Sequence, residues 1–124
     1  MSGLAHPRPV ILVVEDEPLL RMHAVDMIES AGFVVLEAAN ADQAIAILES
    51  RNDIRVVFTD IQMPGSMDGL KLAQAVRGRW PPIEIITTSG HVHINEPDLP
   101  VRARFVPKPY SAAQIESTLA ELTR

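Results

Sequence analysis

Five short apolar runs alternate with segments whose apolar residues recur at helical spacing, and this alternation strongly constrains the fold. The runs cover residues 10–14, 33–38, 55–60, 83–88 and 103–106. Each run is too short for an amphipathic helix and is bounded by turn residues, which is typical of buried strands. Strands that alternate with helices through short links predict an α/β fold, with a parallel sheet covered by helices on both faces.

The segments between the runs carry signals that begin and end helices. Pro18 follows the first run, at a place where proline suits the first turn of a helix, and Gly32 suits the residue after that helix. Ser111 and Gln114 form a capping-box pattern before the last helix. Gly78 and the two prolines that follow it predict the end of the third helix.

The link between the fourth and fifth runs departs from this pattern. Residues 91–102 include Pro97 and Pro100 and few apolar residues, so we expect at most a short helix or a turn there. The fourth helix is therefore predicted to be shortened or irregular. Five strands connected in this way suggest the doubly wound order 2-1-3-4-5, with a switch point between the first and third strands.

The composition limits the number of domains and excludes several kinds of site. A chain of 124 residues suits one domain, with residues 1–8 as a flexible lead-in. The chain has no cysteine, which excludes disulfides and zinc–thiolate sites and fits a reducing compartment such as the cytoplasm. A net charge of −5 argues against a nucleic-acid surface. There is no signal-peptide pattern and no apolar run long enough to cross a membrane.

Acidic residues end the first and third runs. In the predicted strand order these two strands are neighbours, so Glu15 and Asp16 should lie beside Asp60 at the carboxyl edge of the sheet. Two carboxylates about 5 Å apart repel each other by about 3 kcal/mol at an effective dielectric of 20. Such a cluster needs shifted pKa values or a cation, and Mg²⁺ prefers oxygen ligands of this kind.

Two more polar residues are predicted at the same edge. Ser89 ends the fourth run and Lys108 follows the fifth. Taken singly, the acidic residues could be a solvated helix start and Lys108 an exposed lysine. A carboxylate nucleophile, a metal ion, an ammonium and a hydroxyl around one point indicate a phosphoryl-transfer site.

The chain resembles the receiver domain of bacterial two-component response regulators, of the single-domain type, over about residues 10–122. The motifs that carry the resemblance are Glu15-Asp16, the stretch Asp60-Ile61-Gln62-Met63-Pro64, Asp68-Gly69, Ser89-Gly90 and Lys108-Pro109. The resemblance implies a flavodoxin-like fold. It also implies that Asp60 accepts a phosphoryl group from a histidine kinase or a histidine phosphotransfer protein.

The resemblance also implies roles for the residues around Asp60. Asp16 would bind Mg²⁺ or Mn²⁺ directly, together with Asp60, and Glu15 would bind it directly or through water. The backbone carbonyl of Gln62 would be a further metal ligand, and Lys108 would contact a phosphoryl oxygen.

A switch pair is implied as well. The Ser89 hydroxyl would turn toward the phosphoryl group, and Phe105 would then swing inward. This sequence has Ser and Phe where Thr and Tyr are commoner, one extra residue between Pro64 and Asp68, and a shorter segment between Gly90 and Phe105. The resemblance at the phosphoacceptor site stands despite these departures, whereas it does not imply the usual output mechanism for this chain.

The expected role is signalling to a protein target, with self-phosphorylation and autodephosphorylation at Asp60 rather than turnover of an external substrate. Oligomeric state stays open between a monomer and a homodimer. One alternative is an interaction module of receiver fold that works without phosphorylation. Another is a hydrolase with an aspartyl nucleophile, but such enzymes usually have Asp-x-Asp after the first strand and a cap domain.

Overall fold

The computed structural model describes residues 8–63, 65, 67–90 and 99–124, and it confirms the predicted α/β architecture. One parallel sheet has the strand order 2-1-3-4-5. Its strands are β1 (Val10–Val14), β2 (Val34–Ala38), β3 (Ile54–Asp60), β4 (Glu84–Ser89) and β5 (Arg104–Pro107). All the carboxyl ends therefore meet at one edge of the sheet, with β1 and β3 side by side.

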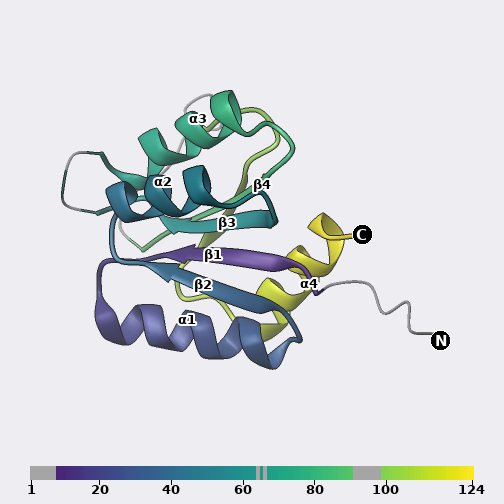
Figure 1. The fold of residues 1–124 in the computed structure, drawn as a ribbon. Coiled ribbons are helices and arrows are strands. Elements are labelled where there is room, and N and C mark those ends of the chain that lie inside the picture. Colours follow the sequence, from purple (N-terminus) through teal and green to yellow (C-terminus); the bar gives the residue numbers. More distant parts are fainter. Residues whose placement is uncertain (1–7, 64, 66, 91–98) are drawn as a thin grey trace.

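Helices cover both faces of the sheet. They are α1 (Pro18–Ser30), α2 (Ala41–Ser50), α3 (Gly69–Arg79) and α4 (Ala112–Leu122). Helices α2 and α3 lie on one face, and α1 and α4 lie on the other (Figure 1). Within the described part of the chain, no helix is long and apolar enough to span a membrane.

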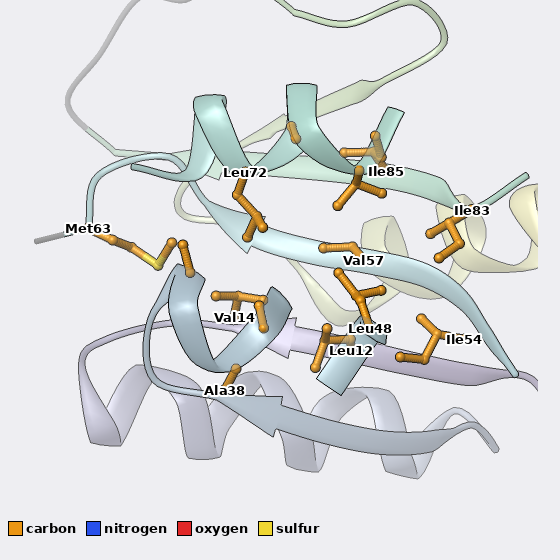
Figure 2. Packing of buried hydrophobic residues seen from close by; sticks show 14 of the residues in the cluster. Leu12, Val14, Ala38, Leu48, Ile54, Val57, Met63, Leu72, Ile83 and Ile85 are labelled. Atoms are coloured by element: carbon orange, nitrogen blue, oxygen red, sulfur yellow. The ribbon is translucent and has the colours of Figure 1, made fainter. Parts of the chain in front are cut away.

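The central strands are buried on both faces. Successive side chains of a strand point to opposite faces, so neighbours in β1 and β3 enter different apolar clusters. Leu12 and Val57 pack with Leu72 under α2 and α3 (Figure 2), whereas Ile11 and Phe58 pack in the cluster under α1 and α4. This double burial explains why the strands read as continuous apolar runs rather than as alternating ones.

The helix ends mostly follow the sequence signals. Gly32 has a φ of +99° just beyond α1, and Ser111 forms both bonds of the predicted capping box. Helix α3 ends at Arg79, between Gly78 and the two prolines, as predicted. A single glycine costs a helix only about 1 kcal/mol, whereas Pro81 cannot continue it.

The link from β4 to β5 is tied to α3. Residues 91–98 lie outside the described residues, so the predicted short or irregular fourth helix stays a prediction there; residues 99–103 contain a turn and no helix. The Arg77 guanidinium donates hydrogen bonds to the carbonyls of Val101 (2.8 Å), Pro81 (2.6 Å) and Ile83 (3.1 Å). One side chain thus joins the last turn of α3 to the segment before β4 and to the end of the link from β4 to β5.

Candidate functional site

Three carboxylates converge at the carboxyl edge of the sheet. Glu15 and Asp16 follow β1, and Asp60 is the last residue of β3. One oxygen from each of the three lies within 4.8 Å of the other two. The two strands are paired, with Val14 opposite Thr59, so the sequence prediction that these carboxylates share one edge is confirmed.

Asp60 is buried and held by two donors. It is only 7% exposed. Its Oδ1 accepts a hydrogen bond from the backbone N–H of Gln62 (3.1 Å), and its Oδ2 accepts one from Lys108 Nζ (2.9 Å). The carboxylate therefore has a fixed orientation.

Lys108 reaches the acidic cluster from the end of β5. Its Nζ also donates to Glu15 Oε1 (3.2 Å), so one ammonium joins the carboxylates of the first and third strands. Burial lowers the pKa of Lys108, but the hydrogen bonds and charges of Asp60 and Glu15 outweigh this and raise it. The lysine is therefore held in its charged form.

The surroundings of Glu15 shift the pKa of its carboxyl in opposite directions. Burial raises the pKa of its carboxyl, and the nearby charge of Asp60 adds to that rise. The Glu17 amide, which donates to Oε2 (3.1 Å), and the Lys108 ammonium oppose it. The net result is a raised pKa of Glu15, with burial as its largest cause.

Gly69, at the start of α3, lies directly against the main chain of Asp60. Its amide donates to the carbonyl of Ile61 (2.8 Å), and α3 begins there with Asp68 as its N-cap. A Cβ at Gly69 would overlap the carbonyl oxygen of Asp60 and lie 2.7 Å from its carbonyl carbon. A residue without a side chain is therefore required for the helix to start so close to the end of β3.

The remaining predicted site residues are Ser89, Gln62 and Phe105. Ser89 is 3% exposed at the end of β4, and its carbonyl accepts the Lys108 amide (3.0 Å). Gln62 contacts Asp60 through its amide, while the metal-ligand role of its carbonyl stays a prediction. Phe105 is half-buried and lines a cavity of about 670 Å³ with residues 99–104; its switch role, like that of Ser89, stays a prediction.

The sequence reading missed Arg21. Its Nη1 donates to the backbone carbonyl of Glu15 (2.9 Å), and its Nε donates to Glu37 Oε1 (3.0 Å). An arginine one turn into the helix that follows an acidic pair was the available signal.

Tyr110 was missed as well. It lines a cavity of about 430 Å³ with Leu20, His23 and Lys108, among others, and its ring meets Phe58 edge-on at 5.6 Å. Burial raises the pKa of the Tyr110 phenol, and the positive charge of Lys108 opposes this. Its place directly after Lys108-Pro109 was the signal.

Helix α1 presents apolar side chains next to this cavity. Leu19 is 69% exposed, and Leu20 and Met22 are also exposed. Leu20 lines the cavity together with Lys108. An apolar surface thus adjoins the charged edge of the sheet.

Doubly wound sheets bind their ligands at the carboxyl ends of the strands, near the switch point. In this chain the polar groups gather at that place, so the fold and the site define a domain of this class. The chain belongs to the response regulator receiver domain family, whose model matches residues 11–120. It is thus a receiver domain of two-component systems, a signalling module.

Similar proteins include sensor kinases and response regulators. Sensor kinase CckA of Brucella abortus is 36% identical over 126 residues, which cover 98% of this chain and 13% of the relative. Response regulator PhoP of Pseudomonas aeruginosa is 35% identical over 118 residues, covering 92% of this chain and 51% of the relative. This chain therefore spans about an eighth of the length of sensor kinase CckA and about half of the length of response regulator PhoP.

Solved structures give the same family. A response regulator receiver protein from Sinorhizobium medicae has a TM-score of 0.87 at 27% identity, covering 95% of this chain and 96% of the other. The receiver domain of hybrid histidine kinase CckA has a TM-score of 0.79 at 28% identity, covering 93% of this chain and 99% of the other.

Proposed function

We propose that Asp60 accepts a phosphoryl group from the phosphohistidine of a histidine kinase or a histidine phosphotransfer protein. The observation that carries this proposal is the Asp60 carboxylate itself, which is buried beside two other carboxylates and hydrogen-bonded to Lys108 at 2.9 Å. The phosphorylated domain then signals to a protein target in the cytoplasm by a change of conformation. The whole chain acts as one receiver domain, without direct contact with nucleic acid or membrane.

The transfer needs a nucleophile and a way to neutralise charge. One Asp60 oxygen forms a bond to phosphorus while the phosphorus–nitrogen bond breaks, and the histidine nitrogen leaves with the electron pair and gains a proton. Lys108 Nζ, which already contacts Oδ2, is placed to contact an oxygen of the transferred phosphoryl group. In this proposal the Ser89 hydroxyl turns toward that group and Phe105 moves inward.

The residues at the edge fit a divalent cation. Glu15, Asp16 and Asp60 offer only carboxylate oxygens and lie within 4.8 Å of one another, the donor chemistry that Mg²⁺ or Mn²⁺ takes. The Gln62 carbonyl is proposed as a further ligand. When bound, the cation supplies positive charge for the phosphoryl oxygens. These carboxylates repel one another, and a bound cation would offset that repulsion.

The apolar surface beside the site supports a protein phosphodonor. Leu19, Leu20 and Met22 expose large side chains on α1, and Leu20 lines the same cavity as Lys108. Exposed apolar groups near a charged centre are typical of a protein interface. A protein seated there could bring its phosphohistidine to Asp60.

The test is phosphorylation followed by intact-protein mass spectrometry. Incubation with Mg²⁺ and a small acyl phosphate should add one phosphoryl group to the wild type and none to Asp60→Asn. Asp53→Asn is the matched control, because Asp53 is an exposed aspartate paired with Arg51 before β3. Failure of the wild type to gain mass, or the same gain in Asp60→Asn, would refute the assignment.

A comparison of partner binding tests the signalling step. If the target binds equally well to phosphorylated wild type, unphosphorylated wild type and Asp60→Asn, the domain works as a phosphorylation-independent interaction module instead.

A further inference from the structure

We propose that Arg21 is a positioning residue that holds the Glu15-Asp16 segment in place for the divalent cation. The inference rests on the proposed function, because it concerns the same cation. It adds two residues outside the cluster of Glu15, Asp16 and Asp60. Arg21 of α1 contacts the main chain of Glu15, and Glu37 of β2 accepts a hydrogen bond from Arg21.

The Arg21 side chain makes two anchored hydrogen bonds. It is 20% exposed, and its Nη1 donates to the Glu15 carbonyl at 2.9 Å while its Nε donates to Glu37 Oε1 at 3.0 Å. Its backbone N–H donates to the Glu17 carbonyl (2.9 Å), which fixes the residue in the first turn of α1. A planar guanidinium with two acceptors has little freedom to rotate, so Glu37 on β2 fixes the direction in which Arg21 holds the Glu15 carbonyl.

The carbonyl is one of three points at which Glu15 is held. The Glu15 amide donates to the Ala38 carbonyl (3.1 Å), and the carboxylate accepts from Lys108 and from the Glu17 amide. The peptide plane after Glu15 is shared with Asp16, so the bond from Arg21 also sets the orientation of the Asp16 backbone.

The carboxylates of Glu15, Asp16 and Asp60 repel one another, so the cluster needs contacts that hold it together. Without a cation, like charges push the segment after β1 away from Asp60. Lys108 counters this on the carboxylate side, and Arg21 holds the same segment on the backbone side. A preformed arrangement of ligands binds a cation more tightly than one that the cation must assemble.

Electrostatics alone predicts the opposite effect. The positive charge of Arg21 lies near the cation site, so neutralising it should tighten cation binding if the charge were its only influence. A positioning role predicts weaker binding. The sign of the change therefore separates the two explanations.

The test is a titration of unphosphorylated protein with Mn²⁺, in which the free ion is measured by electron paramagnetic resonance and Mg²⁺ is added as competitor. Arg21→Gln should weaken binding by about tenfold, as for other groups that orient metal ligands. Arg21→Lys keeps the charge but cannot span both acceptors, so its affinity should fall between those of the wild type and Arg21→Gln. Arg51→Gln is the matched control, since it removes the same charge from an exposed ion pair before β3 and should leave affinity unchanged.

A double-mutant cycle with Glu37 identifies the mechanism. Glu37→Gln should weaken Mn²⁺ binding in the wild type but have no further effect in Arg21→Gln, because the two residues act through one contact. Circular dichroism at the assay temperature establishes that each variant is folded. If Arg21→Gln does not fold, the cycle is run with Arg21→Lys, and an affinity equal to that of the wild type then refutes the proposal.

The outcomes separate this inference from the proposed function. Unchanged or tighter binding in Arg21→Gln, with normal binding by the wild type, overturns the role of Arg21 alone. Failure of the wild type to bind Mn²⁺ overturns the proposed cation site and the role of Arg21 with it. Weaker binding that is coupled to Glu37 supports both.

Discussion

Replacing Gly69 by alanine should reduce the stability of the domain and distort its proposed phosphoacceptor site. A Cβ at this position would overlap the Asp60 carbonyl oxygen and lie 2.7 Å from the Asp60 carbonyl carbon and 2.8 Å from the Ile61 Cα. Carbon atoms in contact normally lie about 3.5–4.0 Å apart, so the start of α3 and the end of β3 must separate by about 1 Å. All of these obstacles are backbone atoms, which cannot move aside as a flexible side chain could.

The expected loss in the free energy of unfolding is about 3 kcal/mol, at the upper end of the usual range for overpacked sites. For a domain of this size this lowers the melting temperature by about 10 °C. The displacement also moves Asp60, and a misplacement of about 1 Å can slow a reaction by about a hundredfold. Urea unfolding measures the first effect, and the rate of mass gain with a small acyl phosphate measures the second.

Gly78 in the same helix provides a matched control. A Cβ at Gly78 would meet no atom within 4 Å, so Gly78→Ala should stabilise the helix by about 0.5–1 kcal/mol. The two substitutions should therefore have opposite signs. Equal stability of Gly69→Ala and the wild type, or an equal loss in Gly78→Ala, would refute the close-approach explanation.

Three further changes can be checked by urea unfolding. Thr88 Oγ1 is buried without a hydrogen-bond partner among the described residues, so Thr88→Val should gain about 1 kcal/mol, and a loss would show that the hydroxyl is satisfied. Ser111→Ala removes the capping box of α4 and should lose about 1 kcal/mol, whereas no loss would mean that the cap contributes nothing. The raised pKa of Lys108 means that its stabilisation is full below the ordinary lysine pKa of about 10.4 and is lost as the pH rises through the folded-state pKa. The stability difference between the wild type and Lys108→Met should therefore shrink above that pH, and a constant difference would contradict the charge-based explanation.

The sequence predicted the parts of the site that depend on topology. Once β1 and β3 are neighbours in a parallel sheet, residues just beyond their carboxyl ends must lie together, and this placed Asp16 beside Asp60 without any knowledge of side-chain directions. Lys108 was predicted at the same edge for the same reason, and the structure adds the ion pairs it makes there.

The parts that depend on side-chain direction could not be predicted in this way. A long side chain such as Arg21 can reach many acceptors from a helix, and the sequence does not say which one it meets. Trp80 is a second example, because its place before Pro81-Pro82 fits either a partner contact or a cover over the core. In the structure it packs against the core cluster and carries the Arg79 guanidinium 4.3 Å above its ring.

The ion pair between Glu15 and Lys108 joins residues 93 positions apart, one just after the first strand and one just after the last. A chain still being synthesised, or one that has lost its last strand, would present Asp60 without the ammonium that orients it. Phosphorylation at this site would then depend on completion of the whole sheet. If Asp60 carries the signal as proposed, only molecules with a complete sheet would therefore transmit it.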